Sequence, residues 1–175
     1  MMITASVFLA VLLSAPSSMP QGEELHAMIA EHDARLFWAA FEGCDVDALA
    51  PLLGDDFRMV HDLAGLAVPN RDAFLRGMAE QCDARQPGGD NAGYKNRRLV
   101  TPGSRRVQAL GDWGALEEGH HSFFELQSDG HWKLTGGARY IHVWEWKEGS
   151  FVLSESISVD HDAVMPYPPA GAGVD

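Results

Sequence analysis

The spacing of apolar residues divides the chain into a helical first half and a strand-rich second half. Over residues 22–42 apolar side chains recur at steps of three and four, which predicts an amphipathic helix that ends at Gly43. Asp45 is suited to cap a second, short helix over residues 46–53, and Asn70 to cap a third. Pro51 is expected to keep the second helix short or to kink it.

Alternation of apolar and polar residues predicts one early strand at residues 57–62 and a continuous series of strands from Tyr94 onward. The segment around Gly65 and Pro69 is expected to form a turn between the first strand and the third helix. Helices followed by neighbouring strands indicate an α+β fold with its helices on one face of an antiparallel sheet. The later strands are expected at residues 94–100, 105–110, 114–126, 138–146 and 151–161.

The size and charge of the chain narrow the classes of protein to which it can belong. Its 175 residues suit one domain, with 46% hydrophobic and 22% charged residues as in an ordinary globular protein. The formal net charge of -12 argues against a nucleic-acid partner, which would need a clustered basic face. The basic doublets Arg97-Arg98 and Arg105-Arg106 are interpreted as the solvated faces of two strands.

Residues 4–16 form an apolar run that is too short to span a bilayer and ends in small residues and Pro16. This pattern is typical of a secretory signal peptide, although no Lys or Arg precedes it; a buried first helix is the alternative. We therefore expect a signal peptide over residues 1–20, cleaved between Ala15 and Gln21, and a periplasmic or secreted protein without a membrane anchor. One domain over residues 22–162 and a flexible Pro/Gly/Ala-rich tail over residues 163–175 would follow.

The two cysteines, Cys44 and Cys82, could pair in an oxidising compartment. Cys82 also lies on the apolar face of the predicted third helix, where it could equally serve as a small core residue. The sequence leaves this choice open. It contains no CxxC motif and no Cys/His spacing typical of zinc sites.

Several short motifs, in their order along the chain, resemble those of the NTF2-like superfamily, in particular its SnoaL-like and DUF4440-type members. They cover residues 24–161. Each motif is degenerate, so their order carries the resemblance. The motifs are Asp45-Val-Asp-Ala-Leu-Ala-Pro-Leu-Leu-Gly-Asp-Asp-Phe57, Asn70-Arg-Asp-Ala-Phe74, Tyr140-Ile-His-Val-Trp144, Gly149-Ser-Phe-Val-Leu153 and Ser158-Val-Asp-His161.

This resemblance implies a cone-shaped, strongly bent antiparallel or mixed sheet whose concave face is closed by N-terminal helices to form a pocket. The outer sheet face of such proteins often forms a homodimer. The superfamily includes isomerases, dehydratases, cyclases and dimerisation domains, so the fold selects no function. The Tyr, acidic donor and Asp base of its steroid isomerases have no matching set in this sequence, which puts that activity in doubt.

Side chains alternate across a strand, so parity predicts which residues face the pocket. Four histidines, His61, His121, His142 and His161, share the predicted concave face, whereas His120 is expected on the outer face and His26, His32 and His131 in structural or exposed positions. A β-bulge would reverse the facing of every residue beyond it. The expected pocket wall comprises Phe37, Phe41, Met59, Phe123, Tyr140, Trp144 and Glu155.

Three functions suit such a pocket: binding a small, partly apolar organic molecule, general-base catalysis of a lyase or isomerase type, and metal binding. Candidates for catalysis are the four histidines together with Asp62 and Asp160 as carboxylate partners. A single histidine in a strand is also often a satisfied polar core residue. No metal motif such as HExxH is present, so we expect no metal and no cofactor. A homodimeric interaction module without a ligand is the remaining alternative.

Overall fold

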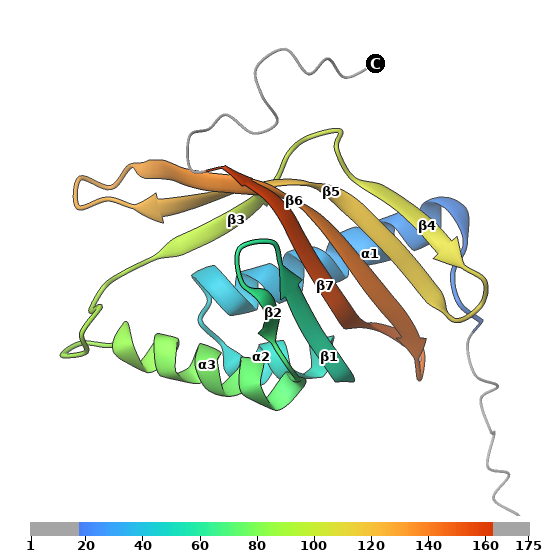
Figure 1. The fold of residues 1–175 in the computed structure, drawn as a ribbon, viewed down its shortest axis with the longest axis horizontal. Coiled ribbons are helices and arrows are strands. Elements are labelled where there is room, and N and C mark those ends of the chain that lie inside the picture. Colours follow the sequence, from blue (N-terminus) through green and yellow to red (C-terminus); the bar gives the residue numbers. More distant parts are fainter. Residues whose placement is uncertain (1–17, 163–175) are drawn as a thin grey trace, which may run out of the picture.

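The computed structural model describes residues 18–162, which form a curled mixed sheet of seven strands with the helices on its concave side (Figure 1). The predicted α+β class and bent sheet are confirmed. The helical segments are α1 (Gly22–Phe37), a π-helical turn η1 (Trp38–Glu42), α2 (Val46–Leu49), a 3₁₀ turn η2 (Ala50–Leu52) and α3 (Arg71–Ala84). The strands are β1 (Leu53–His61), β2 (Gly65–Val68), β3 (Asn96–Val100), β4 (Arg106–Leu110), β5 (Gly114–Leu126), β6 (Trp132–Lys147) and β7 (Ser150–Asp162).

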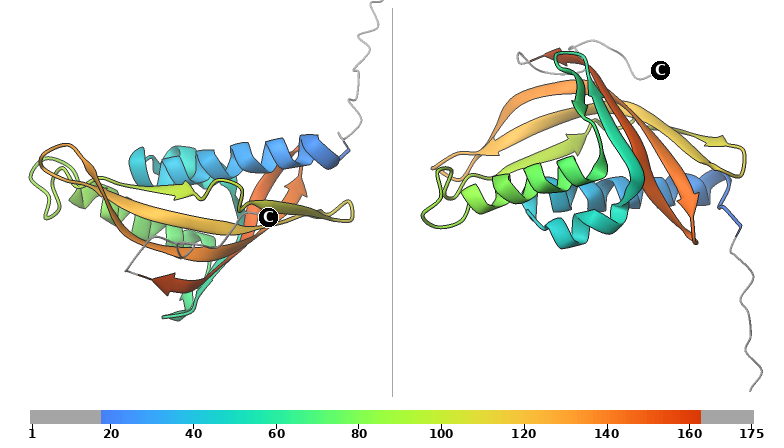
Figure 2. Two further views of the ribbon diagram at one scale, coloured as in Figure 1. Left: turned by 90° about the horizontal axis from the view of Figure 1, so that it is seen from above. Right: turned by 60° about the horizontal axis from the view of Figure 1, so that its bottom comes forward.

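The sheet has the order β2-β1-β7-β6-β5-β3, and β4 pairs with another part of β5. Strands β1 and β7 run parallel, and every other pair in the described part of the chain is antiparallel. The three long strands β5, β6 and β7 curve around the helices, so that α1 and α3 lie inside the bend (Figure 2). A cavity lies between the sheet and these helices.

The first helix buries the apolar stripe that its sequence predicts, with Leu25, Ile29 and Leu36 almost fully buried. It continues into η1, a wider π-helical turn of the kind often found at functional sites. The chain leaves η1 at Gly43, where a Cβ atom would come within 2.7 Å of the Trp38 ring. A side chain at residue 43 would therefore displace the exposed Trp38 ring, at the point where the sequence predicts the helix to end.

The two later helices begin at the predicted caps. Asp45 accepts a hydrogen bond from the Ala48 backbone N–H at 2.9 Å, and Asn70 accepts one from Ala73 at the same distance. Cys44 and Cys82 form a disulfide that joins the segment after η1 to α3. The structure thereby decides the question that the sequence leaves open.

Three strands differ from their prediction. Strand β1 begins at Leu53, four residues before the predicted residue 57. Residues 65–68, expected as a turn, form the edge strand β2, which pairs with β1 through a tight hairpin. Leu66 is exposed in this strand, so the sequence has no pattern of buried apolar residues that would indicate it. Strand β6 begins at Trp132, six residues before the predicted residue 138, because the residues around Gly136 still pair with β5. No helix in residues 18–162 is long and apolar enough to cross a membrane.

Candidate functional site

A cavity of about 370 Å³ lies between the concave face of the sheet and the helices α1, η1 and α3. Its wall is mainly apolar, and its polar side chains are four histidines, two serines and Gln81. The aromatic residues of the wall are Phe37, Phe41, Phe57, Phe74 and Phe123. The polar residues on the sheet are His61, His121, His142, Ser156, Ser158 and His161.

The structure thus places all four predicted histidines in the wall of one cavity, together with Phe37, Phe41, Met59 and Phe123. Tyr140 and Trp144 do not line it. Both are fully buried behind the wall, where their polar groups contact Glu117.

Glu155 and Asp160 point away from the cavity because β7 contains two bulges. Between Val143 and Trp144 the partners on β7 skip Ser154, so that Glu155 turns outward and contacts Arg58 at 3.1 Å. A second irregularity places Asp160 in the left-handed region with φ 57°, exposed beside Arg139. The predicted pocket position of Glu155 is therefore wrong, and Asp160 pairs with Arg139 instead of with a pocket histidine.

The two bulges cancel, which explains why His161 still faces inward. Simple alternation from Leu153 predicts residues 155, 157, 159 and 161, whereas the cavity is lined by Leu153, Ser156, Ser158 and His161. Each bulge shifts the facing by one residue, and after both shifts the original parity returns at His161.

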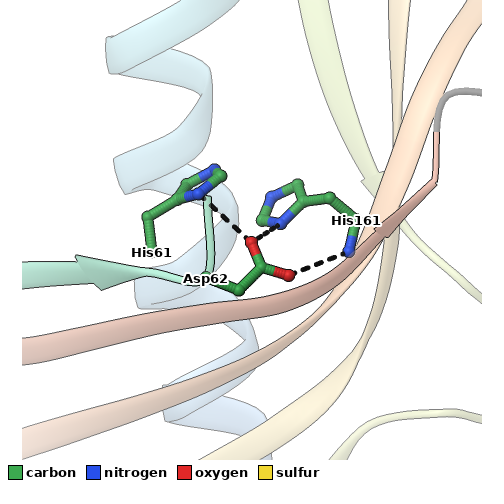
Figure 3. Close-up of side chains that lie close together, drawn as sticks. All are labelled: His61, Asp62 and His161. Atoms are coloured by element: carbon green, nitrogen blue, oxygen red, sulfur yellow. Dashed lines mark hydrogen bonds and ion pairs between the residues drawn. The ribbon is translucent and has the colours of Figure 1, made fainter. Parts of the chain in front are cut away.

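At one end of the cavity His61, Asp62 and His161 form a compact polar cluster (Figure 3). Asp62 accepts a hydrogen bond from Nδ1 of His161 at 2.6 Å, and its other oxygen accepts from the His161 backbone N–H at 3.3 Å. The rings of His61 and His161 stack with centroids 3.9 Å apart. Ser158 Oγ lies 3.1 Å from the remaining His161 nitrogen, Nε2.

The charges within this cluster favour an ionised Asp62 and a neutral His61. Burial raises the pKa of Asp62, but the hydrogen bonds from His161 outweigh it, so its pKa is below the ordinary value. Burial and the neighbouring His161 lower the pKa of His61, against the attraction of Asp62. His61 Nδ1 also accepts a hydrogen bond from the Leu63 backbone N–H at 3.2 Å, which suits a neutral ring.

A second cluster, which we call the ionic core, lies between α1 and the sheet and contacts His121 and His142 of the cavity wall. Its buried carboxylates, Asp33 and Glu117, are both paired with arginines. Arg98 Nη1 donates to both oxygens of Asp33 at 2.6 and 2.8 Å. Arg105 bridges the two carboxylates, with contacts of 2.6 Å to Asp33 and 2.7 Å to Glu117.

Both oxygens of Glu117 also accept hydrogen bonds from neutral donors. Tyr140 donates from its hydroxyl and Trp144 from its indole N–H, each at 2.9 Å. Gly119 permits the approach of Tyr140, because a Cβ atom there would lie 2.9 Å from the phenol oxygen. Burial, and then the charge of Glu117, raise the pKa of Tyr140 and keep it protonated as a donor.

Arg98 connects the ionic core to the cavity. Its guanidinium lies between the rings of Phe37 and Tyr140, 3.7 and 4.4 Å from their centroids, and its Nε donates to Nδ1 of His121 at 2.8 Å. Burial and the charge of Arg98 lower the pKa of His121 to about 2, so the ring is neutral. Since Nδ1 accepts, the proton must reside on Nε2.

That Nε2–H group of His121 is a buried donor without a hydrogen-bond partner among the described residues. His121 is only 3% exposed and lines the cavity. A buried polar group that lacks a partner costs free energy, and such groups are rare in native proteins. His121 therefore has an unused hydrogen-bond donor, on a side chain that lines a mainly apolar cavity.

His142 differs from His121 because its charged neighbours are carboxylates. Its Nδ1 is 3.5 Å from both Asp33 and Glu117, within ion-pair range but without a hydrogen bond. Burial lowers the pKa of His142, yet the two carboxylates outweigh burial and raise it overall. Two histidines on neighbouring strands thus have pKa values shifted in opposite directions.

The ionic core was missed by the sequence interpretation, which placed both arginine doublets on solvated faces. That interpretation is wrong for Arg98, which is buried, and for the partly buried Arg105. Two features of the sequence indicate that this cluster is buried. Glu117 shares the parity of His121 on β5, and Asp33 lies on the apolar stripe of α1, one turn after Ile29.

Two groups of side chains in residues 18–162 bring metal-ligand atoms within 4.8 Å of one another. Asp33, Glu117 and His142 form one, but the two arginines already neutralise its carboxylates. His61, Asp62 and His161 form the other, in which one Asp62 oxygen already lies 2.6 Å from Nδ1 of His161 and 3.3 Å from Nδ1 of His61. The expectation of no metal stays a prediction.

Comparison of the sequence with models of known protein families gives no match, and comparison with curated proteins gives none either. Solved structures do match the fold. Aln2 from a Streptomyces species is similar with a TM-score of 0.64 and 12% identity, covering 79% of this chain and 91% of its own. ActVI-ORFA from Streptomyces coelicolor has a TM-score of 0.64 and 13% identity, covering 81% and 99%.

A protein from Catenulispora acidiphila, whose structure is in complex with S-DNPA, matches with a TM-score of 0.61 and 16% identity over 78% of this chain and 95% of its own. These neighbours have NTF2-like, SnoaL-like folds, and the chain shares that architecture. At such low identities the likeness shows the fold and carries no function by itself.

Proposed function

We propose that the protein binds a small, mostly apolar organic molecule that offers one hydrogen-bond acceptor, such as a carbonyl oxygen, in the cavity. The buried Nε2–H of His121 carries this proposal, because an acceptor on the ligand would supply its missing partner. A volume of about 370 Å³ is within the range of small-molecule sites. The Catenulispora neighbour, whose structure is in complex with S-DNPA, gives independent support for a ligand in a protein of this fold.

The test compares two probes that differ in the acceptor, 2-acetylnaphthalene and 2-ethylnaphthalene, with binding followed by tryptophan fluorescence. The ketone is expected to bind about 5- to 10-fold more tightly, the value of one hydrogen bond. His121→Phe should abolish that preference while binding of the hydrocarbon persists. His120→Phe, on the neighbouring residue of β5, is the matched control and should keep the preference. Equal affinity of wild type for both probes would contradict the proposal.

A second function, proton transfer next to a carbonyl, is favoured by the short contact between His161 and Asp62 at the same cavity. A carboxylate on Nδ1 orients the ring so that Nε2 can accept a proton from a bound ligand. Exchange of the methyl protons of 2-acetylnaphthalene in D₂O, followed by NMR, tests this function. Exchange above the buffer rate that is lost in His161→Gln would support it, and exchange that persists in this variant would exclude it.

We also propose that the protein acts in an oxidising compartment. The Cys44–Cys82 disulfide supports this, since such bonds persist mainly in exported proteins. The signal peptide expected over residues 1–20 lies largely outside the described residues. Intact-mass measurement of protein from its own host should show loss of about 20 N-terminal residues; a full-length, reduced species would contradict export.

A further inference from the structure

Ser158, His161 and Asp62 are joined in a closed ring of hydrogen bonds. Asp62 donates its backbone N–H to the Ser158 carbonyl at 3.0 Å, and its carboxylate accepts from both the ring and the backbone of His161. The ring closes through the contact of 3.1 Å between Ser158 Oγ and His161 Nε2. The three side chains therefore hold one another in a fixed arrangement at the cavity wall.

The direction of each proton in this ring follows from chemistry. An ionised Asp62 can only accept, so the proton on His161 resides on Nδ1. When the ring carries only this proton, Nε2 is an acceptor, and the hydroxyl of Ser158 donates to it. A hydroxyl that donates to an imidazole, which in turn donates to a carboxylate, is the arrangement that activates a serine nucleophile.

The backbone next to His161 adopts an unfavourable conformation in this arrangement. Asp160 adopts φ 57°, a left-handed conformation that is unfavourable for a residue other than glycine. The bulge that it creates turns His161 inward, onto the side of β7 that carries Ser158. Without the bulge, residues 158 and 161 would face opposite sides of the sheet, and the contact between them could not form.

We propose that Ser158 and His161 are catalytic residues of an acyl-transfer site, with Asp62 as the positioning residue, that hydrolyses small apolar esters. The proposal rests on the proposed function, because the ester must occupy the cavity. Ser158 lines the apolar cavity and belongs to the same wall as His121, whose free Nε2–H can donate to the carbonyl oxygen as it becomes negative.

The reaction needs only the ester and water. Ser158 Oγ forms a bond to the carbonyl carbon while its proton moves to His161 Nε2. Collapse of the tetrahedral intermediate breaks the bond to the alkoxy oxygen, which takes that proton and leaves as an alcohol. Water then attacks the acyl-serine and gives a proton to His161. A second collapse releases the carboxylic acid and restores the Ser158 hydroxyl.

The same ring of hydrogen bonds could merely fasten the end of β7 to β1, and the experiment must separate the two roles. The substrate is 2-naphthyl acetate, with release of fluorescent 2-naphthol, and covalent capture uses a fluorophosphonate probe read by intact mass. Ser158→Ala and His161→Gln remove the proposed chemistry. Ser154→Ala is the matched control, because its hydroxyl lies on the same strand but bonds the Val143 carbonyl outside the cavity.

Wild type is expected to hydrolyse the ester and to gain one phosphonyl group on Ser158. Ser158→Ala and His161→Gln should lower kcat on the order of 1,000-fold or more, whereas Ser154→Ala should stay within about twofold of wild type. Asp62→Asn should lower kcat with little change in KM, a split that loss of a purely structural contact would not give. Hydrolysis or labelling that survives in Ser158→Ala would overturn the proposal.

A further variant guards against misfolding of Ser158→Ala. In Ser158→Cys the thiol should be alkylated by iodoacetamide faster than an ordinary cysteine, and adding His161→Gln should remove that advantage. Ordinary reactivity in both would also overturn the proposal.

If wild type binds 2-acetylnaphthalene but neither hydrolyses the ester nor takes up the probe, the acyl-transfer site is excluded and the binding function stands. If it binds neither naphthalene probe, both proposals are wrong.

Discussion

Arg98 donates from Nε to Nδ1 of His121 at 2.8 Å, and this one contact fixes which nitrogen of the histidine carries the proton and is free to donate. A permanently charged guanidinium cannot accept a hydrogen bond, so the tautomer has no alternative while the ring is neutral. The ionic core therefore does more than fill space between α1 and the sheet. It sets the hydrogen-bonding character of the cavity wall.

The low pKa of His121 should appear as a loss of stability in mild acid. The unfolded chain takes up a proton at this histidine near pH 6.5, whereas the folded protein does so only near pH 2. The free energy of unfolding should therefore fall as pH drops below about 6.5, with a contribution approaching 1.4 kcal/mol per pH unit. Urea unfolding between pH 7 and 4.5 measures it. His121→Gln, which can still accept from Arg98, should flatten the slope; an unchanged slope would show that His121 is not buried as described.

His142 should act in the opposite direction and at higher pH. Its pKa is raised in the folded state, so its stabilising contribution is complete below the unfolded value of 6.5 and is lost as pH rises through the folded value. Unfolding measured from pH 6 to 9 should show declining stability in wild type and a flatter curve in His142→Gln. A wild-type curve that is level over this range would contradict the ion pairing of His142 with Asp33 and Glu117.

Arg98→Lys should destabilise the protein although the charge is conserved. A lysine cannot contact His121 and both oxygens of Asp33 at once, and it lacks the flat surface that packs between two aromatic rings. We expect a loss of about 1.5–3 kcal/mol, the value of a hydrogen bond to a charged group, in urea unfolding. Arg106→Lys, at the exposed member of the other doublet, should change stability by no more than about 0.5 kcal/mol. Equal effects of the two variants would refute the ionic core.

Reduction of the Cys44–Cys82 disulfide should lower the free energy of unfolding by about 3–4 kcal/mol, since the bond closes a loop across a separation of 38 residues. Thermal unfolding with and without a reductant measures this change. The double variant Cys44→Ala, Cys82→Ala should resemble the reduced wild type and be insensitive to the reductant. A reductant effect that persists in the double variant would have to arise elsewhere.

The sequence by itself determined the elements and the character of the cavity wall. Helix boundaries followed from Gly43, Asp45 and Asn70 because capping and steric clashes are local and act within a few residues. Strand parity placed His121 and His142 on the concave face because β5 and β6 alternate without interruption at these residues.

Tertiary structure alone decided which residues meet. The bulges at Ser154 and Asp160 depend on how β7 pairs with β6, so alternation misplaced Glu155 while His161 returned to the predicted face. Arg98 resembles a surface residue in the sequence because its burial requires Asp33, which lies 65 residues away on α1. A charged side chain can be buried only where the fold places an oppositely charged partner beside it. Here the partner comes from another element, so no single segment of the sequence shows that the charge is buried.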